Sequence, residues 1–262
     1  MEYPDINELL ELQPYLEDSI ILAWRGSVAD GTFRDPSTCE NSFCDYDVIG
    51  VVIPEEHYFH GLDNWGSRGT KEFKNGPWDL VAYEIRKAIG LLEKGNPNIL
   101  SLLYLEEQDY LRVTLPGRVL IQNRDLFIGK HVYNSFMGYA RSQIKKMDSK
   151  TFCGYMGAKR KALVRKFGYD TKNAAHTIRL LRMCIEYFET NGRLTVKRPD
   201  FEQLLSIKDG AYTKEEIIQM AENLIAEGTA LHKVSTMRDR PDHAKVDELC
   251  CRLVRGVLGC ED

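Results

Sequence analysis

The sequence lacks the features that mark several classes of protein. No apolar run approaches the roughly 18 residues that a membrane-spanning helix requires. Residues 1–13 are acidic and lack the basic stretch that opens a secretory signal peptide. No internal repeat and no low-complexity tract occurs. With a hydrophobic content of 43%, these absences favour a globular protein without a membrane segment, and we expect it to be cytoplasmic.

The cysteines do not indicate a disulfide framework or a zinc site. There are seven, an odd number, and they are scattered through the chain, which is typical of reduced thiols. Two close pairs occur, at positions 39 and 44 and at positions 250 and 251. Neither pair has CxxC spacing, and no histidine accompanies them at ligand spacing. The sequence therefore disfavours zinc.

Charge is distributed unevenly along the chain. The whole sequence has a net charge of −4, but residues 130–198 contain sixteen Lys or Arg and four Asp or Glu, which gives this segment +12. A basic block in an otherwise acidic protein is a candidate surface for polyphosphate or nucleic acid. A solvated helical face is the alternative, and composition does not decide between the two.

A short stretch in the first quarter of the chain combines two signals. The turn Gly26-Ser27 directly follows the apolar run at 20–24, and Asp45 and Asp47 then lead into a second apolar run. Side chains two residues apart in a strand point to the same face, so the two aspartates are expected to project together. Paired carboxylates beside a glycine turn suit a divalent cation and a polyphosphate, because Mg²⁺ prefers oxygen ligands and glycine lets backbone N–H groups approach phosphates closely.

A third carboxylate occurs at the start of the next predicted strand. Residues 77–83 are expected to form a strand that leads into a helix at 84–93, and Asp79 stands near its beginning. This position suits a third carboxylate beside the pair at Asp45 and Asp47. Glu84 is the alternative, but helix periodicity predicts that it lies on the surface, so we select Asp79.

Secondary-structure signals divide the chain into an α/β half and a helical half. In the first half we expect a short helix at 5–17, strands at 19–24, 45–53 and 77–83, a loop or hairpin over 55–76, a helix at 84–93, a helix or strand at 99–105 and a hairpin over 111–121. From about residue 124 a helical period takes over, with helices expected at 130–147, 156–167, 171–190, 213–227 and 243–258. The boundary is placed near residue 128.

The helix expected at 171–190 has two contrasting sides. At 100° per residue, Lys172, His176 and Arg179 fall within about 60° of one another. The opposite side carries Ala174, Ile178, Leu181 and Ile185. No acidic residue occurs in this helix before Glu186, whereas a solvated face usually mixes in acids three or four residues apart. The apolar side is therefore expected to pack on other helices, and the basic side to bind anions.

The order of these signals resembles the DNA polymerase beta-like nucleotidyltransferase superfamily. Its signature is a Gly-Ser turn, an acid-x-acid pair on a strand and a third acid on a later strand. Gly26, Ser27, Asp45 and Asp47 match it. The seventeen residues between Ser27 and Asp45 exceed the usual gap, and a surface loop inserted at 34–43, rich in Asp, Pro, Ser, Thr and Asn, accounts for the difference.

A closer resemblance is to the predicted nucleotidyltransferases associated with RNA repair, the RlaP type. The segments that carry it are DYDVIGVVIPEEHYFHGL (45–62), KGNPNILSLL (94–103), SFMGYARSQ (135–143), GYDTKNAAHTIRLLRM (168–183) and MRDRPDHAKVDEL (237–249). The resemblance implies an α+β fold. A mixed-sheet nucleotidyltransferase domain would span residues 1–128, and an all-helical, basic domain that binds nucleotide or RNA would span residues 129–262.

The resemblance also implies a reaction. In a transfer that depends on Mg²⁺ or Mn²⁺, an NMP would move from an NTP to an acceptor hydroxyl, best matched by an RNA end, with release of pyrophosphate. Asp45 and Asp47 would hold two metal ions, and Asp79 would join the one that activates the hydroxyl. Gly26 and Ser27 would contact the β- and γ-phosphates.

The helical half would contribute positive charge to the same reaction. Lys172, His176 and Arg179 would surround the triphosphate or the RNA, where negative charge builds up. Aromatic residues of the helix at 130–147 are candidates to stack on bases, although core packing is their default role.

Two other functions stay open at this point. One is transfer of a nucleotide to a protein hydroxyl, as in AMPylation. The other is RNA binding by a protein whose catalytic site is vestigial. Three retained carboxylates disfavour the second of these, because an unused acidic cluster adds repulsion with no compensating benefit.

Overall fold

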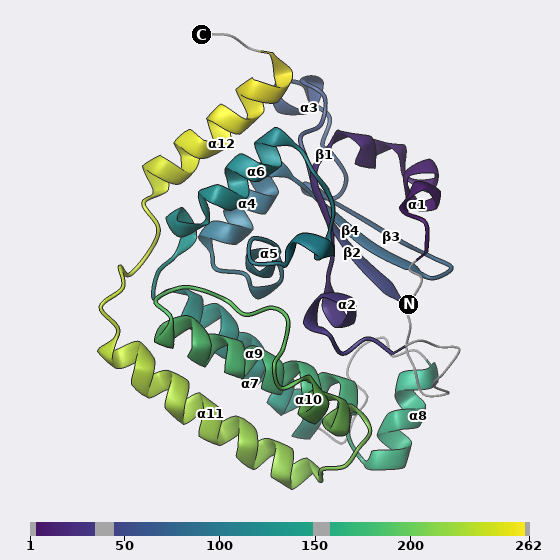
Figure 1. Ribbon diagram of the computed structural model, residues 1–262, viewed down its shortest axis with the longest axis vertical. Helices are drawn as coiled ribbons and strands as arrows, with labels where there is room; N and C mark the ends of the chain where they lie inside the picture. The colour runs from purple at the N-terminus through teal and green to yellow at the C-terminus, as the bar shows by residue number, and fades with distance from the viewer. Residues whose placement is uncertain (1–3, 35–44, 149–157, 260–262) are drawn as a thin grey trace. The chain divides into compact units, whose positions relative to one another are not determined.

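The chain folds into two compact units (Figure 1). The computed structural model describes residues 4–34, 45–148 and 158–259. The first unit consists of residues 1–128 together with 240–262, and the second of residues 129–239. No helix in the described ranges is long and apolar enough to cross a membrane.

A five-stranded mixed sheet forms the centre of the first unit. Its strands are β1 (Ser19–Trp24), β2 (Tyr46–Val52), β3 (Thr70–Asn75), β4 (Trp78–Glu84) and β5 (Tyr110–Val113), in the spatial order β3-β4-β2-β1-β5. β2 and β4 pair in parallel, and the other neighbours pair antiparallel. β2 is therefore an interior strand, which explains why its apolar run is almost continuous.

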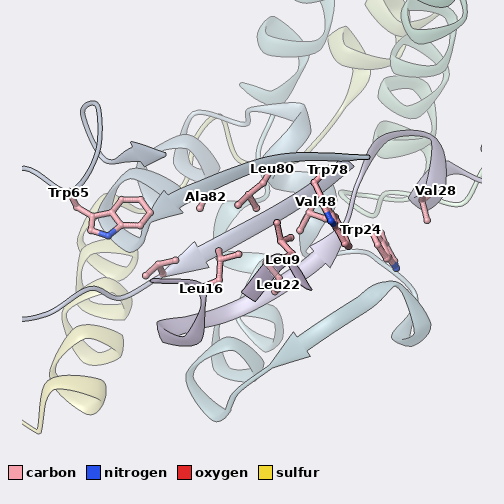
Figure 2. Packing of buried hydrophobic residues seen from close by; sticks show 11 residues of the cluster. Leu9, Leu16, Leu22, Trp24, Val28, Val48, Trp65, Trp78, Leu80 and Ala82 are labelled. Atoms are coloured by element: carbon pink, nitrogen blue, oxygen red, sulfur yellow. The ribbon is translucent and has the colours of Figure 1, made fainter. Parts of the chain in front are cut away.

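One face of the sheet packs against the N-terminal residues. Helix α1 (Ile6–Leu12) begins at Asp5, whose carboxylate accepts a hydrogen bond from the Asn7 N–H at 3.0 Å. Pro14 starts the 3-10 helix η1 (Pro14–Asp18), so the helix expected over 5–17 is divided at this proline. Leu9 and Leu16 are fully buried in the apolar cluster on this face (Figure 2).

The same apolar cluster joins three strands of the sheet. Trp24 of β1 and Trp78 of β4 stack with ring centroids 6.1 Å apart and an interplanar angle of 2°. Leu80 and Val48 lie in the same cluster. Full burial of each such side chain contributes about 1.5–3 kcal/mol relative to exposure. This cluster therefore holds β1, β2 and β4 together at the end where the candidate site lies.

The opposite face of the sheet is covered by helices. Helix α4 (Ile85–Glu93) contacts β2 and β4, and α6 (Leu115–Gln122) contacts β1. Helix α12 (His243–Leu258) packs on α4 and α6 (Figure 1). The remaining short helices of this unit are α2 (Gly26–Asp30), α3 (His57–His60), α5 (Pro97–Leu102), η2 (Glu107–Asp109) and η3 (Arg124–Phe127).

The C-terminal helix lies outside the helical half in which the sequence analysis placed it. Residues 240–262 were grouped with 129–239, whereas α12 returns to the first unit. The physical reason is its apolar stripe, because Val246, Leu249 and Leu253 are buried where α12 packs on α4 and α6. The boundary near residue 128 coincides with the end of the first segment of this unit.

The hairpin predicted over 111–121 is wrong, because β5 ends at Val113 and helix α6 follows directly. Pro116 lies in the first turn of α6, where its missing N–H has no helical partner to lose. A Cβ on Gly117 would lie 2.1 Å from the carbonyl oxygen of Ile20. The Pro-Gly pair thus marks a helix start that approaches β1 closely.

The described residues of the second unit lie in five helices and the segments that connect them. The helices are α7 (Val132–Asp148), α8 (Ala158–Phe167), α9 (Thr171–Glu189), α10 (Phe201–Lys208) and α11 (Lys214–Val234). Helix α9 packs against all four others. Its predicted apolar positions are buried: Ala174, Ile178, Leu181 and Ile185. Helix α10 was not predicted, and α11 extends well beyond the 213–227 expected.

Candidate active site

Two of the three candidate carboxylates lie opposite each other in the sheet. Asp47 of β2 and Asp79 of β4 are paired in the parallel register, so their side chains project from the same face. Asp45 directly precedes β2 and is two residues before Asp47, which places it on that face as well. The three side chains are partly exposed, at 40% for Asp45, 26% for Asp47 and 29% for Asp79. Strand pairing therefore brings the three predicted acids to one end of the sheet.

A lysine from the edge strand bridges two of these carboxylates. Lys74 of β3 lies opposite Asp79 in the antiparallel register. Its Nζ donates to Asp45 Oδ2 at 2.5 Å and to Asp79 Oδ2 at 3.0 Å. The hydrogen bond to Asp45 raises the pKa of Lys74 above its ordinary value, although partial burial opposes this shift. The ammonium group therefore stays charged across the whole physiological range.

An arginine lies on the other side of the aspartate pair. Arg25, the residue after β1, places Nη2 3.0 Å from Asp79 Oδ1 and 3.7 Å from Asp47 Oδ1. Its backbone N–H donates to the Asp47 carbonyl oxygen at 2.9 Å. Arg25 Nε is buried and makes no hydrogen bond within the described part of the chain. Lys74, Asp79, Asp47 and Arg25 thus form one line across four strands, which we call the charged row.

The Gly-Ser turn is built directly against the charged row. Gly26 has φ +61°, and a Cβ at this position would lie 2.5 Å from Asp47 Oδ2. Glycine is therefore required both by the left-handed backbone and by the close approach to the carboxylate. Ser27 follows in the first turn of α2 and is half-buried, and Val28 anchors α2 in the apolar cluster (Figure 2).

Glu84, the alternative third acid, has a structural role. It lies at the opposite end of β4 from Asp79 and is only 4% exposed, so the prediction that it is a surface residue is wrong. Its Oε1 accepts hydrogen bonds from the Arg86 N–H at 2.9 Å and from Arg86 Nε at 3.0 Å. This carboxylate caps α4.

The cationic stripe of Lys172, His176 and Arg179 belongs to the second unit. All three lie on α9, with Lys172 exposed and the other two half-buried. Arg179 Nη2 lies 2.9 Å from His176 Nδ1. Tyr139 of α7 meets the His176 ring edge-on, with centroids 5.2 Å apart. The three residues thus share one side of the helix, as periodicity predicted.

The aromatic residues of α7 divide between core and surface. Tyr133 and Phe136 are 8% and 0% exposed, so they fill the interior as the default expectation held. Tyr139 is 36% exposed and lies beside the cationic stripe. Of these three, Tyr139 is the aromatic side chain that is left partly exposed.

A comparison with protein families identifies the chain. Residues 39–252 match the family described as RlaP, the RNA repair pathway DNA polymerase beta family. The protein belongs to this family. Membership indicates a nucleotidyltransferase role in RNA repair, and the mixed sheet is consistent with a polymerase beta-like domain. No curated protein and no solved structure matches the chain significantly.

The extent of the family match separates the candidate residues into two groups. The three candidate aspartates and the cationic stripe lie within residues 39–252, whereas Gly26 and Ser27 precede them. Of the loop predicted at 34–43, only Arg34 lies in the described ranges, and Cys39 and Cys44 lie outside them.

The carboxylate oxygens of this site are suitable ligands for a divalent cation, but they are not arranged as a complete coordination site. Across the ranges that the structure describes, no three His, Cys, Asp or Glu side chains are grouped so as to hold a metal ion. The positive charges next to the aspartates are instead the side chains of Arg25 and Lys74. Mg²⁺ is commonly bound by one or two carboxylates together with substrate phosphates. The donor set therefore suits a metal ion that arrives with a phosphate ligand.

Arg25 and Lys74 were missed by the sequence analysis. Arg25 adjoins the Gly-Ser turn, and Lys74 lies five residues before Asp79. An Asn-Gly pair at 75–76 is a strong hairpin signal, and reading it as a turn would have placed Lys74 beside Asp79. The sequence analysis instead included this pair in a loop or hairpin over 55–76 and predicted no separate strand before it.

Proposed function

We propose that the protein is a nucleotidyltransferase that depends on a divalent metal ion and moves an NMP from an NTP to a hydroxyl group at an RNA end. The new bond joins the hydroxyl oxygen to the α-phosphorus, and pyrophosphate leaves. The observation that carries the proposal is the register pairing of Asp47 with Asp79, with Asp45 beside them, in a member of an RNA-repair polymerase beta family.

The roles of the carboxylates follow from their positions in the sheet. Asp45 and Asp47 would hold the metal ions, with Asp79 as a further ligand. A metal ion held there would stabilise the charge of the transferring phosphoryl group and lower the pKa of the attacking hydroxyl. Asp79, the acid farthest along the row from Gly26, is assigned to the acceptor hydroxyl, whose proton it takes up as the new bond forms.

The Gly-Ser turn is assigned to the triphosphate. Because Gly26 has no side chain, the backbone at this turn comes close to Asp47, and a phosphate group that shares a metal ion with Asp47 would lie within reach of it. Ser27 offers a hydroxyl group in the first turn of α2. Both residues would thereby orient the β- and γ-phosphates for departure as pyrophosphate.

The second unit is assigned to anion binding. Lys172, His176 and Arg179 would neutralise phosphates of RNA or of a nucleotide bound to this unit, and Tyr139 would stack on a base. The support for this assignment is that the three cationic residues share one side of α9 while its other side is buried. We therefore propose that this unit is a basic nucleotide- or RNA-binding domain.

Nucleotide transfer is tested directly with labelled substrates. Purified protein is incubated with Mg²⁺, each α-labelled NTP and either RNA or a protein extract, and both labelled macromolecules and pyrophosphate are measured. We expect label in RNA and one pyrophosphate per nucleotide added. The double variant Asp45→Ala, Asp47→Ala should lose at least about a thousandfold in rate, since it removes the electrostatic centre of the reaction. A variant that kept its rate would refute the site.

The same experiment separates the acceptors. Label found in protein and not in RNA would replace RNA by a protein hydroxyl as the acceptor. Label in neither, with no pyrophosphate released, would refute the enzymatic proposal. Retained folding of the double variant is checked by circular dichroism, so that loss of rate is not confused with loss of structure.

A further inference from the structure

We infer that Lys74 is an internal counter-cation, which holds the carboxylates of Asp45 and Asp79 until a divalent ion displaces it. This inference rests on the proposed function, because it takes Asp45 and Asp79 as metal ligands. It adds a residue that competes with the metal ion and so couples metal binding to the arrival of the nucleotide.

The contacts of Lys74 are those that a metal ion would make. Its Nζ joins Asp45 Oδ2 and Asp79 Oδ2, at 2.5 Å and 3.0 Å, and the ammonium group carries one of the positive charges that a divalent ion would bring. An ion ligated by both oxygens would have to lie close to both of them, so it and the ammonium group exclude each other.

Lys74 can leave the site more easily than Arg25. Its side chain is 61% exposed, and β3 is an edge strand of the sheet. Arg25 is 30% exposed, has a buried Nε and is tied to Asp47 through its backbone N–H. Lysine also has a flexible four-carbon stem that lets the ammonium move without a change in the backbone. The displaceable cation is therefore Lys74, and Arg25 remains as a fixed member of the row.

The competition has a direct functional consequence. A metal ion without nucleotide must replace the contacts of Lys74 and then fill its coordination sphere with water. A metal ion bound to a triphosphate brings additional oxygen ligands and negative charge. The released ammonium group is then free to contact those phosphates. The free site thus binds bare metal ions more weakly than it binds the metal–nucleotide complex.

The test measures metal binding without turnover. Mn²⁺ binding is followed by electron paramagnetic resonance in the absence of nucleotide, for the wild type and for Lys74→Met. We expect the variant to bind Mn²⁺ roughly tenfold more tightly, since two partly exposed ion pairs no longer oppose the metal ion. Lys74→Arg, which keeps the charge, should bind with an affinity close to that of the wild type.

A matched control lies on the same strand. Lys71 of β3 places its Nζ over the rings of Tyr15 and Trp65, at 4.3 Å and 4.7 Å, and so contacts these two aromatic side chains and not the charged row. Lys71→Met removes the same charge from β3 and should leave Mn²⁺ affinity unchanged. Thermal unfolding gives a second measurement, because metal-free Lys74→Met should melt below the wild type and gain more from added Mn²⁺.

Each outcome bears on one proposal or on both. Tighter binding by Lys74→Met, with Lys71→Met unchanged, supports the inference. Equal or weaker binding by Lys74→Met overturns it while leaving the metal site and the proposed function in place. Failure of the wild type and of every variant to bind Mn²⁺, including in the presence of a non-hydrolysable NTP, overturns the inference and the metal-dependent function together.

Discussion

At the scale of the residue, the candidate site depends on a few contacts with little tolerance. Gly26, Asp47 and Arg25 meet within hydrogen-bonding or van der Waals distance, although the glycine and the aspartate are separated by twenty positions. Gly26 leaves room for the negatively charged side chain of Asp47. Arg25 holds Asp47 in place through its backbone N–H and its guanidinium group. A change of one methyl group is enough to test this arrangement.

The substitution Gly26→Ala should impair both stability and activity. The added Cβ would collide with Asp47 Oδ2, and the left-handed backbone would be strained, at a cost of about 1–3 kcal/mol in unfolding free energy. Displacement of Asp47 should also lower the rate of nucleotide transfer by tenfold or more, as about 1 Å of misplacement does elsewhere. Urea unfolding and the labelled-NTP assay measure the two effects.

Gly90→Ala is the matched control for this substitution. Gly90 lies within α4, and a Cβ there would meet no atom within 4 Å. Alanine should therefore stabilise the helix by about 0.5–1 kcal/mol and leave the rate unchanged. If Gly26→Ala behaved like Gly90→Ala, the turn would have no role in positioning Asp47.

At the scale of the element, helix α9 is the one from which we expect RNA binding. It is packed on its apolar side by four other helices, and its cationic stripe is the part left partly open. The charge of the segment at 130–198 overstates what is available to a ligand. Arg198 is almost fully buried and pairs with Glu186 at 2.7 Å, and Arg182 pairs with Asp200.

The double variant Lys172→Ala, Arg179→Ala should weaken RNA binding and flatten its salt dependence. If each side chain neutralises one phosphate, the slope of log K against log salt should decrease in magnitude by about 1–2. Fluorescence anisotropy with a short single-stranded RNA over a range of salt concentrations measures both quantities. Arg193→Ala, an exposed position of the same basic segment beyond α9, should change the slope less. An equal effect at Arg193 would mean that the charge acts diffusely and not through the stripe.

At the scale of the whole molecule, the chain leaves its first unit after residue 128 and returns to it at 240. The returning helix α12 is capped by Asp242, whose side chain accepts hydrogen bonds from the N–H groups of Ala244 and Lys245. Its first residue, His243, places Nδ1 2.6 Å from Glu93 Oε1 at the end of α4. This contact fastens the C-terminal segment to the unit that holds the carboxylates.

The His243–Glu93 pair should make stability depend on pH. The hydrogen bond and charge of Glu93 raise the pKa of His243 above its ordinary value. A raised pKa means that the pair stabilises the fold fully below the ordinary value of about 6.5 and that this stabilisation is lost as pH rises through the folded-state pKa. His243→Gln should thus lower the midpoint of urea unfolding slightly near pH 5.5 and not at all near pH 9, values on either side of the histidine range.

Glu93→Gln provides the complementary measurement. It removes the partner but keeps a side chain of similar size, so the two single variants should show the same pH dependence of unfolding. A difference from the wild type that was constant between the two pH values would show that His243 acts through packing and not through its charge.

Local patterns in the sequence were sufficient for part of this architecture. The alternation of Asp45 and Asp47 with apolar residues placed both acids on one strand face, because a strand repeats every two residues whatever it pairs with. The spacing of the apolar residues in α9 predicted its buried side for the same kind of reason. The face of a strand or helix on which a residue lies can therefore be predicted from the spacing of residues in that element alone.

Other features depended on pairings between distant residues. The neighbours of Asp47 are Asp79 and Arg25 because β2 lies between β4 and β1 in one register, and a shift of one residue would have placed each side chain on the opposite face. Burial of Glu84 as the cap of α4 and the return of α12 to the first unit have the same origin. The three acids could be predicted from the chain, and the Asn-Gly turn could have placed Lys74 beside Asp79. The contacts of Arg25 with the aspartates emerged only from the folded structure, because register and packing are set by contacts summed over the whole sheet.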